Sequence, residues 1–345
     1  MARVDLTVRG AGIFGLSIAW EAARRGAVVR VVETVRVGAG ASGGVVGALA
    51  PHVPEQWNPK KAFQLDSLLM AQGWWAAAEA AAGMSAGYAR TGRLLPLADA
   101  RAVEQARARS VAAAVLWRGQ ADWRVIAATG AEWKPVSLSG WLVEDTLTAR
   151  IAPRAALAVL VAALRASGGE VVIGEAADEG AVVWASGVAG LADLSARMGR
   201  GVGAGVKGQA LLLAHEARDA PQLFVDGLHI VPHGDGTVAV GSTSENRWEE
   251  ADTTDAQLDA VLARARAALP VLAEAAVVER WAGLRARAAS RAPVLGAWPG
   301  RAGHYIANGG FKIGFGMAPK VAGVVVDLVL EGLDRIPDGF RPENL

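Results

Sequence analysis

Cysteine is absent from this chain of 345 residues. Without a thiol, the protein can have no disulfide bond, no thiolate nucleophile, no Cys-ligated zinc and no cysteinyl bond to a cofactor. Its His, Asp and Glu residues show no cluster with the spacing of metal ligands, so we expect no metal site. A chain without cysteine fits a reducing compartment, and we expect a cytoplasmic protein.

An excess of charge of one sign is missing as well. The chain has 35 Lys and Arg against 34 Asp and Glu, which gives a net charge of +1. A nucleic-acid surface usually shows a block of like charges or a basic stripe with interleaved aromatic residues, and neither occurs here. We therefore expect no nucleic-acid partner.

Long apolar runs are lacking too. The most apolar helical stretches, Ala155–Leu164 and Val321–Leu330, are far shorter than the ~20 residues that span a bilayer. Asp5 and Arg9 interrupt the apolar N-terminal segment and a glycine turn follows, so we expect neither a signal peptide nor a membrane partner. The composition is that of a globular protein, and 345 residues suit two domains.

Glycine, by contrast, is present in quantity, and its first cluster is the turn Gly10–Gly15, with the sequence GAGIFG. Residues 4–8 predict a buried strand, 13–25 a helix and 28–33 a second strand, which together form a βαβ unit. Gly10 permits the tight turn, Gly12 lets the backbone approach a pyrophosphate, and Gly15 lets helix and strand pack closely. The phosphates then lie at the helix N-terminus, where free N–H groups favour anions.

Glu33 ends the second strand, 21 residues past Gly12, where it can accept hydrogen bonds from an adenosine ribose. An acidic group at this position repels a 2′-phosphate, which argues against NADP. The βαβ unit alone leaves FAD and NAD open. Arg9 departs from the usual pattern, because the residue before the first glycine is normally apolar. We favour a surface carboxylate over a phosphate as its partner.

The rest of the chain alternates between two kinds of pattern. Segments that suit parallel α/β structure lie at the start, in the middle and at the end, whereas those between them look antiparallel. Further helices are predicted at about 60–82, 99–114, 153–166, 255–269 and 317–331, and further strands at 170–173, 181–184, 206–213, 223–231, 237–242, 277–284 and 305–307. The predicted fold class is α/β, with a Rossmann-like dinucleotide-binding domain interleaved with an antiparallel-sheet α+β domain.

Four segments beyond the first turn resemble the glycine oxidase / D-amino-acid oxidase (DAO) family of FAD enzymes. They are the flavin-proximal loop 40–49 (GASGGVVGAL), the second dinucleotide turn 183–187 (VWASG), the substrate-arginine segment 281–296 (WAGLR and APVLG) and the C-terminal flavin loop 309–314 (GGFKIG). The resemblance covers nearly the whole chain, although 88–145 is generic. It implies the glutathione-reductase-2-type DAO fold, with an FAD-binding domain at 1–56, 146–200 and 286–345 and a substrate-binding domain at 57–145 and 201–285.

The cofactor implied by this resemblance is FAD, held without a covalent bond, because the chain has no cysteine and the loop 40–47 has no histidine. Small residues at 41–48 would let the backbone lie against the isoalloxazine, and Ser42 can bind a phosphate. The N-terminus of the helix expected from Met317 would face the flavin N1–C2=O2 edge and favour its anionic reduced form. The cofactor contacts we expect are Gly10, Gly12, Ile13, Phe14, Gly15, Glu33, Thr34, Ala41, Ser42, Gly43, Val46, Gly47, Ala48, Ala177, Ser186, Gly187, Gly309, Gly310, Phe311, Ile313 and Gly314.

Arg285, Lys312, His229 and His52 are the candidate catalytic residues. Arg285 matches the family's carboxylate-binding arginine, although a surface arginine is the alternative. Lys312, in the order Gly-Phe-Lys, resembles the carboxylate-binding lysine of sarcosine-type oxidases, and a lysine that only pairs with a nearby carboxylate is the alternative. His229 stands where glycine oxidases carry a substrate-binding tyrosine, with a plain sheet-edge histidine as the alternative, and His52 is expected at the pocket entrance. His233, in a turn, is expected to be solvated.

The resemblance implies an FAD-dependent oxidoreductase that oxidises the C–N bond of a small amino acid or secondary amine of the glycine, sarcosine or D-amino-acid type. Hydride transfer to flavin N5 would give an imine that water hydrolyses, with oxygen or another electron acceptor taking the electrons. Ala239 stands where monomeric sarcosine oxidases carry a lysine that promotes oxygen reduction, so the acceptor stays open. The alternatives are a DAO-type domain acting on an aminomethyl-modified tRNA base and a non-catalytic flavin subunit of a larger complex. A monomer and a homo-oligomer are equally open.

Overall fold

The computed structural model describes residues 3–130 and 132–345 and begins with the predicted βαβ unit. Strand β1 (Leu6–Arg9) leads into helix α1 (Ile13–Arg24), and β2 (Val29–Glu33) returns parallel to β1. On its other side β1 pairs, also in parallel, with β9 (Ala181–Trp184). The first strand therefore lies inside a sheet and is covered on both edges, as its continuous apolar character predicts.

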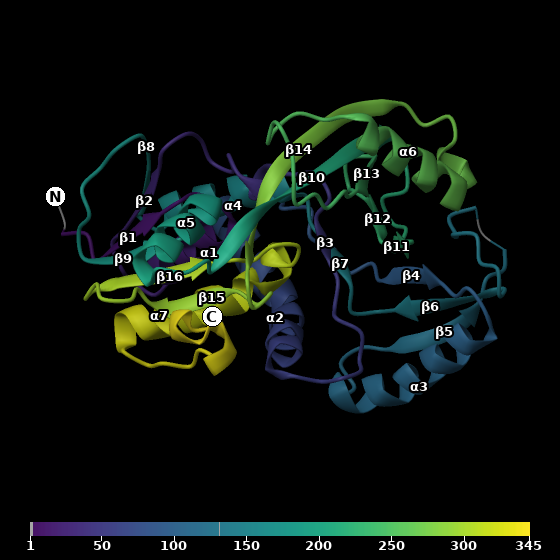
Figure 1. Ribbon diagram of the computed structural model, residues 1–345, viewed down its shortest axis with the longest axis horizontal. Coiled ribbons are helices and arrows are strands. Elements are labelled where there is room, and N and C mark those ends of the chain that lie inside the picture. The colour runs from purple at the N-terminus through teal and green to yellow at the C-terminus, as the bar shows by residue number, and fades with distance from the viewer. Residues whose placement is uncertain (1–2, 131) are drawn as a thin grey trace.

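The first sheet contains six strands in the order β15-β16-β9-β1-β2-β8. The remaining strands are β8 (Glu170–Ile173), β16 (His304–Asn308) and β15 (Val294–Ala297), and only β15 runs antiparallel to its neighbour. These strands come from the start, the middle and the end of the chain, as the colours of Figure 1 show. The predicted Rossmann-like, interleaved α/β class is confirmed.

Four helices pack together beside this sheet: α1, α2 (Pro59–Ala82), α4 (Pro153–Ala166) and α7 (Gly314–Glu331). Trp20 of α1 meets Trp74 of α2 edge to face, with 4.7 Å between the ring centroids. Because of these contacts α2 belongs to the core of the first sheet, whereas the predicted boundary at residue 57 groups it with the substrate-binding segments. The domain boundaries remain a proposal.

The second sheet contains eight strands in the order β14-β10-β13-β12-β11-β4-β6-β5, all antiparallel except for the pair β11 and β4. Its strands are β4 (Arg93–Pro96), β5 (Trp123–Ala127), β6 (Trp141–Asp145), β10 (Gly203–Ala214), β11 (Gln222–Val225), β12 (Leu228–Pro232), β13 (Thr237–Gly241) and β14 (Val277–Ala288). Helix α6 (Ala256–Ala268) packs on β10, β12 and β13, and α3 (Ala100–Leu116) packs on β5. Figure 1 shows this sheet to the right of the first.

The third sheet is short and has two strands, β3 (Ala48–Leu49) and β7 (Ala149–Arg150). It joins the loop after β2 to the segment that enters α4. Among the described residues, no helix combines the length and the apolar character needed to cross a membrane.

Two local predictions were wrong, and one helix was missed. Residues 223–231 form a hairpin, not one strand, because Asp226 and Gly227 both have positive φ (47° and 79°) and turn the chain back. Helix α7 begins at Gly314 rather than at Met317, so Gly314 lies in its first turn. Helix α5 (Gly187–Met198) was not predicted at all.

Candidate active site

The first glycine turn has the tight geometry that its sequence predicts. Gly10 has φ +110°, and a Cβ on it would lie 2.6 Å from the carbonyl oxygen of Ala185. A Cβ on Gly15 would lie 1.9 Å from the carbonyl oxygen of Gly10. Larger residues at positions 10 and 15 would therefore force apart the turn, the helix and the second dinucleotide turn.

Glu33 and Arg9 flank this turn. One carboxylate oxygen of Glu33 accepts the N–H of Ala11 at 2.9 Å, so the acid is fixed beside the glycine turn, with the exposed Thr34 next to it. Arg9 forms an ion pair with Asp178 at 2.6 Å, which confirms the favoured surface carboxylate. The loop that carries Asp178 also holds the predicted contact Ala177, which is exposed.

The second dinucleotide turn abuts the first. Ser186 precedes α5, and its hydroxyl is buried without a hydrogen-bond partner among the described residues. The carbonyl of Gly187 accepts the side-chain N–H of Asn308 at 2.8 Å, which ties this turn to the end of β16. A buried hydroxyl without a partner costs free energy unless a ligand satisfies it.

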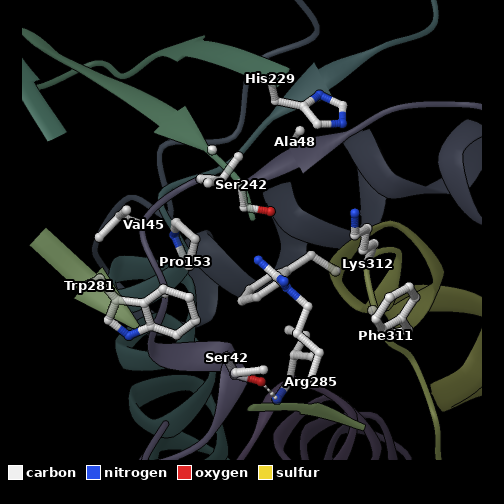
Figure 2. Close-up of a pocket in the computed structure, with 18 of the residues that line it drawn as sticks. Ser42, Val45, Ala48, Pro153, His229, Ser242, Trp281, Arg285, Phe311 and Lys312 are labelled. Carbon is white, nitrogen blue, oxygen red and sulfur yellow. Dashed lines mark hydrogen bonds between the residues drawn. The ribbon is translucent and has the colours of Figure 1, made fainter. Parts of the chain in front are cut away.

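A cavity of about 370 Å³ opens where the loop after β2 meets the second sheet. It is lined by Ile13, Ala41, Ser42, Gly44, Val45, Val46, Gly47, Ala48, Pro153, Phe224, Gly227, His229, Gly241, Ser242, Trp281, Arg285, Phe311, Lys312, Gly314 and Phe315. The lining brings predicted cofactor residues together with three of the four predicted catalytic residues. Figure 2 shows Arg285 and Lys312 directed toward the same space.

Arg285 lies on β14 and is buried. Its Nη1 donates to the carbonyl of Thr243 at 3.3 Å, and no carboxylate of the described residues forms an ion pair with it. The neighbouring strand makes room for the guanidinium, since a Cβ on Gly208 would lie 1.7 Å from Nη1. Burial lowers the pKa of Arg285 to about 10, so it keeps its charge at neutral pH. A buried cation without a carboxylate partner is suited to bind an anion.

Lys312 stands in the loop between β16 and α7. Burial and then the charge of Arg285 lower its pKa, which places the two cations in one electrostatic environment. Its ammonium lies 5.7 Å from the ring centroid of Phe311, and Phe311 itself has a positive φ of 44°. A non-glycine residue in this conformation is strained, and such strain is common at binding sites.

The ring of His229 on β12 lies at the same cavity and packs against Phe224, with 4.7 Å between the centroids. Its pKa is lowered to about 3, mainly by burial and further by the charges of Arg93, Lys312 and Arg285. Nδ1 has no hydrogen-bond partner among the described residues. The imidazole is therefore neutral near pH 7 and suited to hydrogen bonding rather than to proton transfer.

The other two histidines named from the sequence lie elsewhere. His52 does not line the cavity, and its ring makes a hydrogen bond with Gln64. His233 was expected to be solvated, and that was wrong: it is buried, and Nε2 lies 2.9 Å from the carbonyl oxygen of Val45. Within the described ranges, no group of three or more His, Asp or Glu side chains could hold a metal ion.

Several lining residues had not been singled out from the sequence. Trp281 lies inside a motif quoted above, and a Cβ on Gly44 would lie 3.3 Å from its ring. Ser242 opens the polar run Ser-Thr-Ser-Glu directly after β13, which is a detectable signal at a strand end. Phe224 precedes the hairpin turn that was overlooked. Ala239 is buried and does not line the cavity.

The residues present fit FAD. The two adjoining turns pack so closely that positions 10 and 15 have no room for a Cβ, which is the geometry that a dinucleotide-binding turn needs, and Ser186 offers an unsatisfied hydroxyl. At the other end, the loop 41–48 lines a cavity with small side chains and leaves space against the backbone. The helix α7 begins at the same cavity with Gly314, so its free N–H groups and dipole are available to a negatively polarised edge.

Comparison with known proteins agrees with this fit. The family model described as "FAD dependent oxidoreductase" (DAO) matches residues 5–328. Glycine oxidase from Pseudomonas putida is 34% identical over 143 residues, which cover 40% of this chain and only 39% of that protein. The putative thiamine biosynthesis oxidoreductase ThiO from Rhizobium etli is 29% identical over 94% of this chain and 96% of its own length.

Two solved structures have the same fold. Iminodiacetate oxidase from Chelativorans sp. BNC1 superposes with a TM-score of 0.87 and 21% identity, covering 98% of each chain. Glycine oxidase from Geobacillus kaustophilus superposes with a TM-score of 0.82 and 21% identity, covering 98% of this chain and 97% of that one. At this identity they show the fold, whereas the family match spans nearly all of the sequence. The chain belongs to the DAO family of FAD-dependent oxidoreductases.

Proposed function

We propose that this protein oxidises the C–N bond of a small amino acid or N-substituted glycine. The observation that carries the proposal is Arg285, a buried cation without a carboxylate partner, which faces the same cavity as the small-residue loop 41–48. Glycine oxidases among the relatives and iminodiacetate oxidase among the solved structures act on substrates of this kind by their names. The loops assigned below to the isoalloxazine line the same cavity, so the space left for the substrate is small.

The chemistry needs little from side-chain acids and bases. When bound, FAD supplies the hydride acceptor, and water hydrolyses the resulting imine. The protein's own contribution is to hold the carbon that bears the amine in a fixed orientation and to select for a neutral amine. This fits a cavity whose polar side chains include two cations, a neutral imidazole and the Ser242 hydroxyl, but no carboxylate from the described residues.

Within that cavity we assign Arg285 to the substrate carboxylate, with Lys312 as a second cation for the same end of the substrate. His229 would hydrogen-bond the amine, since its unpartnered Nδ1 is enclosed at the cavity and its pKa of about 3 keeps the ring neutral. A neutral ring adds no third positive charge that would compete with Arg285 and Lys312 for the substrate carboxylate. His52 has no role in this proposal.

For the cofactor, we assign the adenosine and pyrophosphate to the turns 10–15 and 186–187, with Glu33 beside the ribose. We assign the isoalloxazine to the loops 41–48 and 309–314. Supporting observations are the glycine contacts described above, the buried Ser186 hydroxyl and the start of α7 at the cavity. The electron acceptor is oxygen or another oxidant.

Anaerobic mixing of the purified holoenzyme with glycine, sarcosine, D-alanine, D-proline and a polyamine tests the proposal. Loss of the visible flavin absorption band is the measurement. We expect bleaching by at least one carboxylate-bearing amine and none by the polyamine, because only the former satisfies Arg285. Bleaching by the polyamine alone would contradict the carboxylate assignment, and a flavin that none of these amines bleaches would contradict the proposed activity.

A further inference from the structure

A buried carboxylate, Glu245, is connected to Arg285 through one intervening residue. Arg285 Nη1 donates to the backbone carbonyl of Thr243, and this is the hydrogen bond that holds the guanidinium in the structure. The hydroxyl of the same Thr243 donates to Oε1 of Glu245. Only 8% of Glu245 is exposed, so its interactions are shielded from water and sensitive to the loss of any partner.

Gln209 on β10 holds both Thr243 and Glu245. Its backbone N–H donates to the Thr243 hydroxyl oxygen at 2.8 Å, and its side-chain Nε2 donates to Glu245 Oε1 at 3.1 Å. Its Oε1 accepts the N–H of Asp255 at 2.8 Å, which fixes the orientation of the amide. Gln209 is fully buried in the centre of a strand, so the residue that holds Thr243 and Glu245 is itself fixed.

The backbone of Glu245 is fastened to the same strand. Its N–H donates to the carbonyl of Lys207 at 2.9 Å, and its carbonyl accepts the N–H of Lys207 at 3.0 Å. The Lys207 ammonium lies 3.9 Å from Glu245 and 3.8 Å from Asp255. The segment after β13 is therefore held against β10 by backbone hydrogen bonds and by side-chain charges together.

We propose that Glu245 is a positioning residue for substrate binding: with Gln209 it fixes Thr243, whose carbonyl directs the Arg285 guanidinium into the cavity. The inference rests on the proposed role of Arg285 as the carboxylate-binding residue. An arginine has many rotamers, and an anchor that selects one of them lowers the entropy that binding would otherwise cost. The Glu245 charge also opposes the effect of burial on the pKa of Arg285.

Titration of the holoenzyme with sodium acetate tests this, with the change in the flavin spectrum as the readout and acetamide as the neutral control ligand. Glu245→Ala removes the acceptor of the Thr243 hydroxyl, and we expect acetate to bind about tenfold more weakly while acetamide binding and FAD content stay unchanged. Glu245→Gln keeps an oxygen in place of Oε1, and we expect acetate affinity within about threefold of the wild type. Thr243→Val removes the same link from the other side and should reproduce the loss seen with Glu245→Ala.

A double-mutant cycle with Arg285→Met separates positioning from a general effect on the site. If Glu245 acts through Arg285, Glu245→Ala changes acetate affinity no further in the Arg285→Met protein. Additive losses, or equal losses in the Gln and Ala variants of Glu245, would overturn the inference while leaving the proposed function standing. Unchanged acetate binding in Arg285→Met alone would overturn the carboxylate assignment on which both rest.

Discussion

The side-chain oxygen of Ser42 accepts the backbone N–H of Ile13 at 3.0 Å, although 29 residues separate them along the chain. This bond connects the small-residue loop 41–48 to the first turn of α1, where free N–H groups can bind the phosphates of the expected cofactor. Both residues line the same cavity. The phosphate end and the flavin end of the expected FAD site are thus linked by one hydroxyl.

Ser42→Ala should weaken FAD binding about tenfold, because it removes a hydrogen-bond partner from the helix N-terminus and a potential phosphate ligand. The measurement is the FAD dissociation constant of the apoprotein, taken from fluorescence titration. Ser110→Ala is a suitable control, since this hydroxyl only returns to the carbonyl of Ala106 within α3. Equal FAD affinity in the Ser42 variant and the wild type would refute this role.

Gly15→Ala should destabilise the fold by about 1–3 kcal/mol and reduce the FAD content of the purified protein. The new Cβ would lie 1.9 Å from a backbone oxygen, and backbone cannot move aside as a side chain can. Gly323→Ala in α7 is the matched control, because no atom lies within 4 Å of its added Cβ. That change should be neutral or stabilising by up to about 1 kcal/mol, as urea unfolding would show.

Asp145→Asn should cost about 3–5 kcal/mol of unfolding free energy. Asp145 is fully buried and lies directly opposite Arg93 in the strand pair β4–β6, with 2.8 Å between the charged atoms. Removing its charge leaves the buried Arg93 without a counter-ion. The exposed pair Asp122 and Arg124 serves as the control, and Asp122→Asn should change stability by less than about 1 kcal/mol. Equal urea midpoints for Asp145→Asn and Asp122→Asn would contradict the claim that the buried ion pair matters more to stability than the exposed one.

His229→Gln should make the protein less sensitive to acid. The folded-state pKa of His229 is lowered to about 3, whereas the unfolded chain takes up this proton near pH 6.5. Between these values the unfolded state binds more protons, so stability falls as pH falls from about 6.5 toward 3. Thermal melts of wild type and variant across pH 4 to 7 measure how strongly stability depends on pH. Part of the pH dependence of stability should remain in the variant, because the pKa values of His52 and His233 are lowered as well.

Local patterns predicted most of the fold. The bounds of α4, β8 and β9 agree with the sequence-based ranges, since apolar periodicity and flanking glycines determine such elements locally. The hairpin β11–β12 was missed because two apolar runs around Asp226 and Gly227 were taken as one strand. That Asp-Gly pair was the signal of a tight turn.

The site was only partly predictable, and distance along the chain explains why. Arg285, Lys312 and His229 stand in or beside recognisable segments, and the fold brings them to one cavity. Glu245 depends on its pairing with Gln209, 36 residues away, and the burial of His233 depends on Val45, 188 residues away. Such contacts leave no local trace in sequence.

The most direct test of the account is the rate of anaerobic flavin reduction by a carboxylate-bearing amine in the wild type and in Arg285→Met. Glycine and its uncharged relative glycinamide form the substrate pair, and a thermal melt of each protein shows that the fold is intact. We predict that the substitution slows reduction by glycine at least about 100-fold and leaves reduction by glycinamide nearly unchanged, because only glycine loses a charged partner. Equal rates with glycine in the two proteins would contradict the central claim that Arg285 holds the substrate.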